Sequence, residues 1–186
     1  MSRNRTTQRG FTLIEIMIVV AMIAVLVAIA IPVFSGTSRK AKGGSEVGSY
    51  FQDFRTRMDQ YLQEHGVYPP TIGEGTFWPA APTAAKQTIL PLPLAWTTDV
   101  PVGLGPFKFR MSGSADVYCG YTWATGTASD NTNRGGIAAA APFNFTAPET
   151  SWYYLMAKCN LDGVGGFSYY FTSSVNPAIQ VLNEGS

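Results

Sequence analysis

One carboxylate, that of Glu15, stands inside an otherwise apolar stretch near the start of the chain. The stretch runs from Phe11 to Phe34, and the 19 residues that follow Glu15 are uncharged. An ionised residue in an apolar span costs about 2.5 to 3.5 kcal/mol near mid-bilayer and is usually kept for a function. The simpler alternative is a boundary residue that reaches the headgroups. We therefore treat Glu15 as a candidate functional residue.

The apolar stretch is long enough to cross a membrane. Residues 11–34 form 24 positions, or about 36 Å of helix at 1.5 Å per residue, and a bilayer needs about 20 residues. A secretory signal has a shorter apolar core and a small-residue cleavage site. This stretch instead leads into further helical sequence, so we expect a transmembrane anchor. Pro32 lacks a backbone donor and predicts a kink or a locally unwound segment.

The chain has two cysteines, Cys119 and Cys159, both beyond the apolar stretch. They lie in or beside different predicted strands, which favours a disulfide in an oxidising compartment. Two free buried thiols are the alternative. A metal site is not expected, since His65 is the only histidine and lies far from both cysteines in the sequence.

Length and composition predict one folded domain on one anchor. The chain has 186 residues, a formal charge of +1 and only 13% charged residues. About 150 residues remain after the leader and the anchor, enough for one compact core. The near-neutral charge gives no reason to expect a nucleic-acid surface. The sequence has no phosphate-binding loop and no evident catalytic group, so we expect neither an enzyme nor a cofactor.

The second half of the predicted helix is amphipathic. After a glycine-rich segment at residues 35–48, which could be a linker or a weak part of one long helix, apolar residues recur at helical spacing. They are Val47, Phe51, Phe54, Met58, Tyr61, Leu62 and His65. Gly66 and the prolines after it should end the helix near His65. Residues 67–106 are rich in proline and predict an irregular connection.

Strand patterns follow, at residues 107–111, 116–124, 152–159 and 166–172. The segment at residues 125–150 shows no strand pattern. The predicted fold class is therefore α+β, with a long N-terminal helix packed on an antiparallel sheet of about four strands. We divide the chain into a leader (1–10), an apolar helix (11–34), the second half of the helix (35–66) and a loop-rich β-sheet head domain (67–186).

The start of the sequence resembles the type IV pilin family, including the pseudopilins of type II secretion. The resemblance is carried by Gly10, by Phe11-Thr12-Leu13-Ile14-Glu15 and by the apolar helix behind a basic leader. It implies that a prepilin peptidase cuts between Gly10 and Phe11 and methylates the new amino group of Phe11. It also implies that Glu15 neutralises the amino terminus of a neighbouring subunit. Pro32 falls at a position where many pilins have a proline inside the helix.

The resemblance implies a structural subunit of a type IV pilus-like filament, assembled through the apolar helix. The expected partners are further copies of the chain, the peptidase, an inner-membrane assembly platform, and the lipid bilayer before assembly. The precursor would be an inner-membrane protein with a cytoplasmic N-terminus, and the filament would be extracellular. The alternatives are a periplasmic pseudopilus of type II secretion and an anchored binding module that never polymerises.

Overall fold

The structure, a computed structural model, describes residues 11–69, 76–89, 116–128, 142–143, 145–146 and 148–184, apart from the side chains at positions 32–33, 35–37 and 39–40. The chain forms two compact units, Met1–Ser38 and Arg39–Ser186. The strand predicted at residues 107–111 lies outside the described residues.

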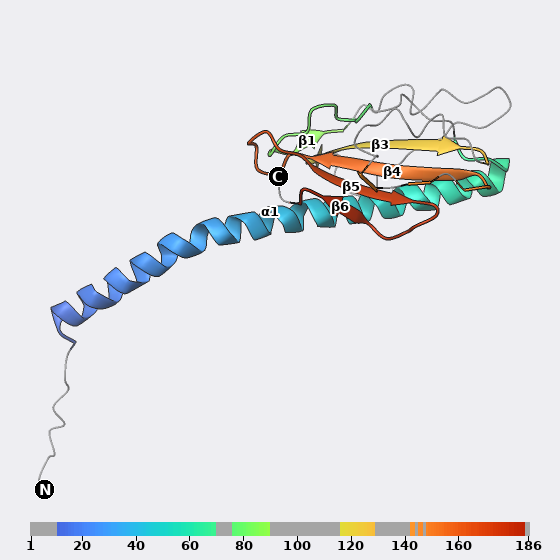
Figure 1. Cartoon of the computed structure of the whole chain (residues 1–186). Coiled ribbons are helices and arrows are strands. Elements are labelled where there is room, and N and C mark those ends of the chain that lie inside the picture. Colours follow the sequence, from blue (N-terminus) through green and yellow to red (C-terminus); the bar gives the residue numbers. More distant parts are fainter. Residues whose placement is uncertain are drawn as a thin grey trace, which may run out of the picture. The chain divides into compact units, whose positions relative to one another are not determined.

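One helix, α1 (Leu13–His65), contains both the apolar stretch and the amphipathic stretch (Figure 1). The glycine-rich segment at residues 35–48 is helical, and the boundary between the two units lies within it. The backbone is also helical at Pro32 and on both sides of it, so of the predicted kink or unwound segment the structure excludes the unwound segment. The helix ends as predicted, because Gly66 takes φ 75° and donates its N–H to the Leu62 carbonyl at 2.8 Å.

The second unit contains a four-stranded antiparallel sheet in the order β3-β4-β5-β6. Its strands are β3 (Cys119–Gly126), β4 (Trp152–Cys159), β5 (Ser168–Ser173) and β6 (Gln180–Leu182). A two-stranded sheet pairs β1 (Gln87–Thr88) with β2 (Asp116–Val117). The predicted α+β class and antiparallel sheet are confirmed. We did not predict β1 or β6, which are too short to show a sequence pattern.

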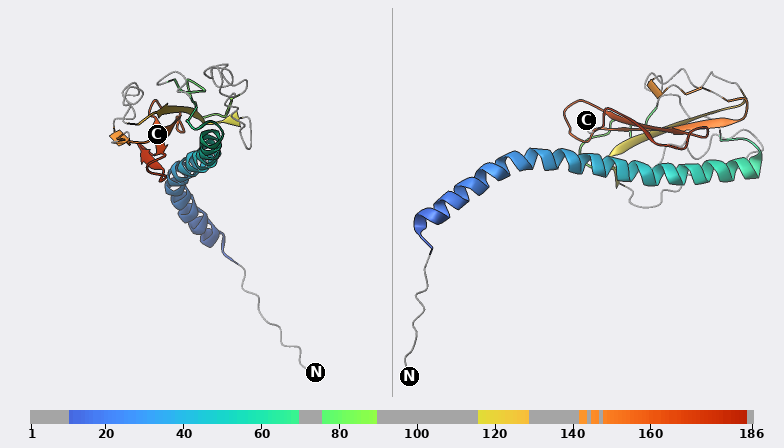
Figure 2. Two further views of the ribbon diagram at one scale, coloured as in Figure 1. Left: turned by 90° about the vertical axis from the view of Figure 1, so that its right-hand side faces the viewer. Right: turned by 60° about the horizontal axis from the view of Figure 1, so that its bottom comes forward.

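The amphipathic half of α1 packs on one face of this sheet, and Figure 2 shows the helix running alongside the strands. Alternate side chains of β3 and β4 meet the helix, because successive residues of a strand point to opposite faces. The resulting core includes Val47, Tyr50, Phe51, Phe54, Met58 and Tyr61 from α1 and Tyr121, Trp123, Tyr153, Leu155 and Ala157 from the sheet. The predicted apolar stripe is thus the buried face of the helix.

The opposite face of the sheet is covered as well. A second core joins Trp152, Tyr154 and Met156 of β4 and Phe171 of β5 to aromatic side chains from outside the strands: Phe77, Phe143 and Phe145. The rings of Phe143 and Phe171 stack at 4.9 Å between centroids. β4 is therefore buried on both faces, between the helix and a layer of irregular chain.

Candidate functional site

The start of α1 is capped by three reciprocal hydrogen bonds between Thr12 and Glu15. The Glu15 N–H donates to the Thr12 hydroxyl at 3.3 Å, and the Thr12 N–H and hydroxyl donate to Glu15 Oε2 at 3.4 and 3.3 Å. This arrangement is a capping box, which satisfies backbone donors that have no partner within the helix. The Glu15 carboxylate therefore faces the amino-terminal end of its own helix.

The helix behind this cap exposes its apolar side chains. Every residue from Phe11 to Ile29 is exposed, and Phe11 itself is 81% exposed. The stretch Leu13–Ile31 is long and apolar enough to cross a membrane, and it is the one helical stretch of this kind among the described residues. In this first unit no described contact covers the apolar surface, and Glu15 is its only carboxylate among the described residues.

A second carboxylate of α1, that of Glu46, binds the beginning of β3. Oε1 accepts hydrogen bonds from the N–H groups of Tyr118 and Cys119 at 3.0 and 3.1 Å and from the Tyr121 hydroxyl at 2.9 Å. Oε2 accepts from the same Tyr118 N–H at 2.9 Å. Burial raises the pKa of the Glu46 carboxyl, and these donors and the charge of Lys86 oppose that rise.

The two cysteines form a disulfide at this same end of the sheet. Cys119 and Cys159 are direct partners in the β3–β4 register, with their Cα atoms 4.2 Å apart, and they are linked by an S–S bond. Both residues are fully buried. The bond joins the first residue of β3 to the last residue of β4 and closes a 40-residue separation in the sequence.

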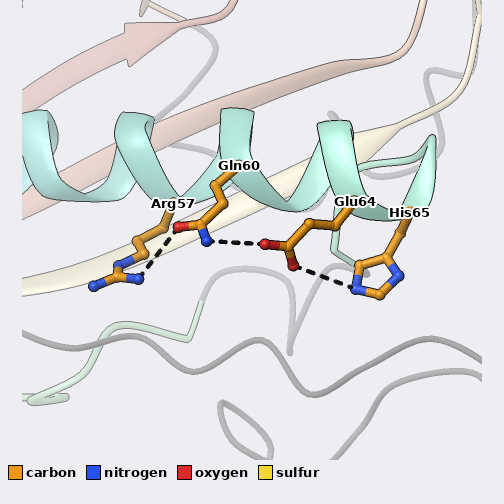
Figure 3. Close-up of polar contacts among 4 residues, drawn as sticks. All are labelled: Arg57, Gln60, Glu64 and His65. Atoms are coloured by element: carbon orange, nitrogen blue, oxygen red, sulfur yellow. Dashed lines mark hydrogen bonds and ion pairs between the residues drawn. The ribbon is translucent and has the colours of Figure 1, made fainter.

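The exposed side of the last turns of α1 carries a row of polar side chains (Figure 3). Arg57 donates to Gln60, and Gln60 donates to Glu64 at 2.9 Å. His65 Nε2 lies 3.9 Å from Glu64 Oε2, and the His65 ring packs against Tyr61 at 4.3 Å between centroids. The His65 side chain is 21% exposed, so the last residue of the predicted apolar stripe is partly buried. These contacts follow one helix face and converge on no common point.

Among the described residues, no three His, Cys, Asp or Glu side chains are grouped as metal ligands would be. The structure shows a capped apolar helix and a disulfide-linked head, and the polar contacts of Glu15, Glu46 and Glu64 are made with other residues of the same chain. Such an arrangement can anchor and pack, and the unusual chemistry it offers is the single carboxylate at the start of α1.

Comparison with known proteins bears on that start. The family described as "Prokaryotic N-terminal methylation motif" matches residues 5–31. A type IV major pilin protein PilE1 of Neisseria gonorrhoeae is 33% identical over 81 residues, which are 44% of this chain and 37% of the relative. The type IV major pilin protein PilA of Myxococcus xanthus (strain DK1622) is 39% identical over 79 residues, 42% of this chain and 36% of the relative.

Type IV major pilins are among the relatives of this chain. The prepilin peptidase-dependent protein D of Escherichia coli (strain K12) is also similar, with 44% identity over 59 residues, 32% of this chain and 40% of the relative. The chain thus spans well under half the length of each of these three relatives. No solved structure matches it. The resemblance that we based on Gly10, Phe11 and Glu15 is confirmed at the level of the family motif and of its pilin relatives.

The residues that carry the resemblance to pilins lie in different parts of the structure, and one lies outside the described residues. Gly10 lies outside the described residues, Phe11 and Glu15 lie together at the exposed start of α1, and Pro32 lies inside the helix. Sequence reasoning missed Thr12 and Glu46. The Thr-x-x-Glu spacing before an apolar run is a capping-box pattern that signals Thr12. Glu46 precedes Tyr50 by four residues, and this spacing places it on the buried helix face.

Proposed function

We propose that this chain is a structural subunit of a type IV pilus-like filament. The observation that carries the proposal is the start of α1, where an apolar helix with exposed side chains contains one carboxylate, held at its amino-terminal end. In a helix that only anchored the head in lipid, this carboxylate would do no more than cap the first turn. A helix that packs against copies of itself can use the carboxylate to select one register.

The precursor in this proposal crosses the inner membrane through residues 11–34, with its N-terminus in the cytoplasm. Prepilin peptidase cuts between Gly10 and Phe11 and methylates the new amino group. An inner-membrane assembly platform then moves the subunit from lipid into the filament, where further copies of the chain replace the bilayer around the apolar helix. The motif match over residues 5–31 and the pilin relatives support this order of events.

Glu15 would change partners during assembly. In the isolated chain its carboxylate accepts hydrogen bonds from Thr12, and in the filament it would pair with the Phe11 amino group of a neighbouring subunit. An unpaired charge in a dry bundle is costly, whereas a carboxylate and an ammonium group compensate each other. The cap keeps the carboxylate at the end of the helix that the neighbour's amino group must approach.

The test is the yield of filaments from Glu15→Val. Removing one partner of a buried ion pair typically costs about 3 to 5 kcal/mol, and this loss recurs at each subunit addition. We expect sheared filaments to fall at least tenfold relative to total subunit on immunoblots, while membrane insertion, cleavage and the head disulfide persist. Glu64→Gln, which removes an exposed carboxylate near the other end of α1, is the matched control and should retain the yield.

The same experiment separates the alternatives. Filaments recovered from the cell surface support a pilus, whereas subunits that polymerise only in the periplasm support a pseudopilus of type II secretion. A wild-type chain that forms no filament in either place, while its assembly platform is present, would identify an anchored binding module instead. Wild-type filament yield from Glu15→Val would refute the role assigned to this residue.

A further inference from the structure

The contact between Glu46 and the start of β3 holds a weak part of α1 on the sheet. We call this contact the Glu46 latch: the Glu46 carboxylate with the N–H groups of Tyr118 and Cys119 and the Tyr121 hydroxyl. From this geometry we infer that α1 can detach from the head over residues 43–48 without unfolding the sheet, and that the latch keeps this segment attached.

The first support is the composition of the helix around the latch. Gly43, Gly44 and Gly48 all lie within one turn of Glu46, and each interior glycine costs about 1 kcal/mol relative to alanine. A Cβ added at Gly44 or Gly48 would meet no atom within 4 Å. Packing against the head therefore does not require glycine at these two positions, and what glycine adds there is a lower cost of leaving the helical state.

The second support is an imperfect contact beside the latch. A Cβ at Gly43 would lie 2.6 Å from Leu161 Cδ1 and 3.0 Å from the Tyr170 hydroxyl, so helix and sheet approach closely at this point. The Tyr170 side chain is 2% exposed, and its hydroxyl has no hydrogen-bond partner among the described residues. Detachment of the segment would let water reach this hydroxyl, which reduces the cost of opening.

The third support is the chemistry of the latch itself. In this segment the Glu46 carboxylate connects α1 to the start of β3. Its two oxygens accept hydrogen bonds from three donors, which would lose this partner if the carboxylate were removed. A buried charge that is well hydrogen-bonded contributes little net stability, because the cost of desolvation offsets the bonds, yet removing it leaves its donors unsatisfied. Such a contact closes reversibly and in one geometry.

The rest of the helix is held differently. From Phe51 to Tyr61 the contact with the sheet is made by large buried side chains, including Phe54 and Met58, which are 1% and 0% exposed. Phe54 also packs against Trp123 at 5.4 Å between ring centroids. Opening at residues 43–48 therefore exposes one buried apolar side chain, Val47, and stops at the large rings that begin with Tyr50 and Phe51. The latch lies in a helix segment with little apolar packing, directly before the segment that the apolar core holds on the sheet.

Hydrogen–deuterium exchange of the full chain in detergent micelles tests this inference. In Glu46→Ala we expect amides of residues 42–50 to exchange about tenfold faster, because the side chain that bonds this helix segment to Tyr118, Cys119 and Tyr121 is gone, while residues 51–61 and β4 stay within about twofold of wild type. Adding Gly44→Ala and Gly48→Ala should reverse the increase, since alanine stabilises the helix and finds open space at both sites. Glu64→Gln is the control and should change nothing in residues 42–50.

The alanine pair also tests the inference alone, in case Glu46→Ala does not fold. In otherwise wild-type protein, Gly44→Ala with Gly48→Ala should slow exchange of residues 42–50 by about tenfold and leave β4 unchanged. Two results would overturn the inference. One is unchanged exchange in both variants, and the other is an equal increase across helix and strands in Glu46→Ala, which would make Glu46 a part of the global fold only.

Discussion

Cys119 and Cys159 face each other directly across β3 and β4, and the backbone N–H of Cys119 is bound by Glu46 of α1. One end of the sheet is thus fixed twice, by a covalent bond between two strands and by a carboxylate from the helix. Both connections meet at the first residue of β3. Their consequences can be measured separately.

Loss of the disulfide should weaken the head without changing its fold. In the chain-entropy picture, a bond that closes a loop of about 40 residues contributes roughly 4 kcal/mol. We expect the Cys119→Ala, Cys159→Ala double variant to lose about that much unfolding free energy in urea titrations. Peptide mapping under non-reducing conditions should find the two cysteines linked within one wild-type chain. Ready alkylation of both thiols in the native protein would contradict the bond.

Processing should depend on Gly10. The motif match over residues 5–31 includes this position, and a small residue before Phe11 lets the peptidase approach the backbone. We expect Gly10→Val to accumulate as uncleaved precursor in the membrane, while the wild-type chain yields N-methylated Phe11 as its first residue in a mass spectrum. Gly36→Ala serves as a comparison variant with intact cleavage. Native protein that retained residues 1–10 would rule out this processing.

The hydroxyl of Thr12 should stabilise the first turn of α1. Replacing an N-cap threonine by a residue without a side-chain acceptor costs about 1 kcal/mol. In Thr12→Val, the amide of Glu15 should therefore lose about fivefold in protection from exchange in micelles, because it loses the hydroxyl acceptor and keeps only the Thr12 carbonyl. Thr12→Ser keeps the hydroxyl and should behave as wild type. Equal protection in the serine and valine variants would show that the capping box contributes nothing.

The Glu46 carboxyl should make the stability of the head fall as pH rises. Burial raises its pKa in the folded chain above the unfolded value of about 4.3. Between those two values the folded chain binds more protons than the unfolded chain, so its unfolding free energy decreases as pH rises through the folded pKa. The groups that act on Glu46 are Lys86 and Tyr121, with Tyr50 on its own helix.

Glu46→Gln isolates that effect, since glutamine does not titrate. The unfolding free energy of both proteins is measured in urea from pH 4 to pH 8. As pH increases, that of the wild type should decrease relative to that of this variant. Burial also raises the pKa of Tyr50 and Tyr121, so neither phenol titrates in this range. A difference that is constant with pH would mean that the carboxyl has the same pKa in both states.

The sequence predicted those parts of the fold that show a long periodic pattern. The stripe from Val47 to Tyr61 repeats over four turns, and β3 and β4 each extend over eight residues, so their patterns stand out from the surrounding sequence. β6 has three residues and β1 has two. Segments this short carry too few side chains to show alternation, and their pairing is decided by neighbouring strands.

The polar contacts of the site were predictable only where the two partners are close together in the sequence. Thr12 and Glu15 are three residues apart, so the pattern of a capping box is visible in the chain. Glu46 binds residues that follow it by more than 70 positions, and no rule of spacing connects them. Its place on the buried helix face could be inferred, but its partners depend on how the sheet lies over the helix.

Burial of β4 on both faces has a consequence for how this protein can change over time. The strand has one charged residue, Lys158, and its other side chains meet either the helix or the outer aromatic layer. Point substitutions in β4 are therefore constrained from two directions. The irregular chain outside the sheet only has to supply a few large rings, such as Phe143 and Phe145, at suitable places. Sequence drift can accumulate there, giving the head a new exterior while its middle layer stays the same.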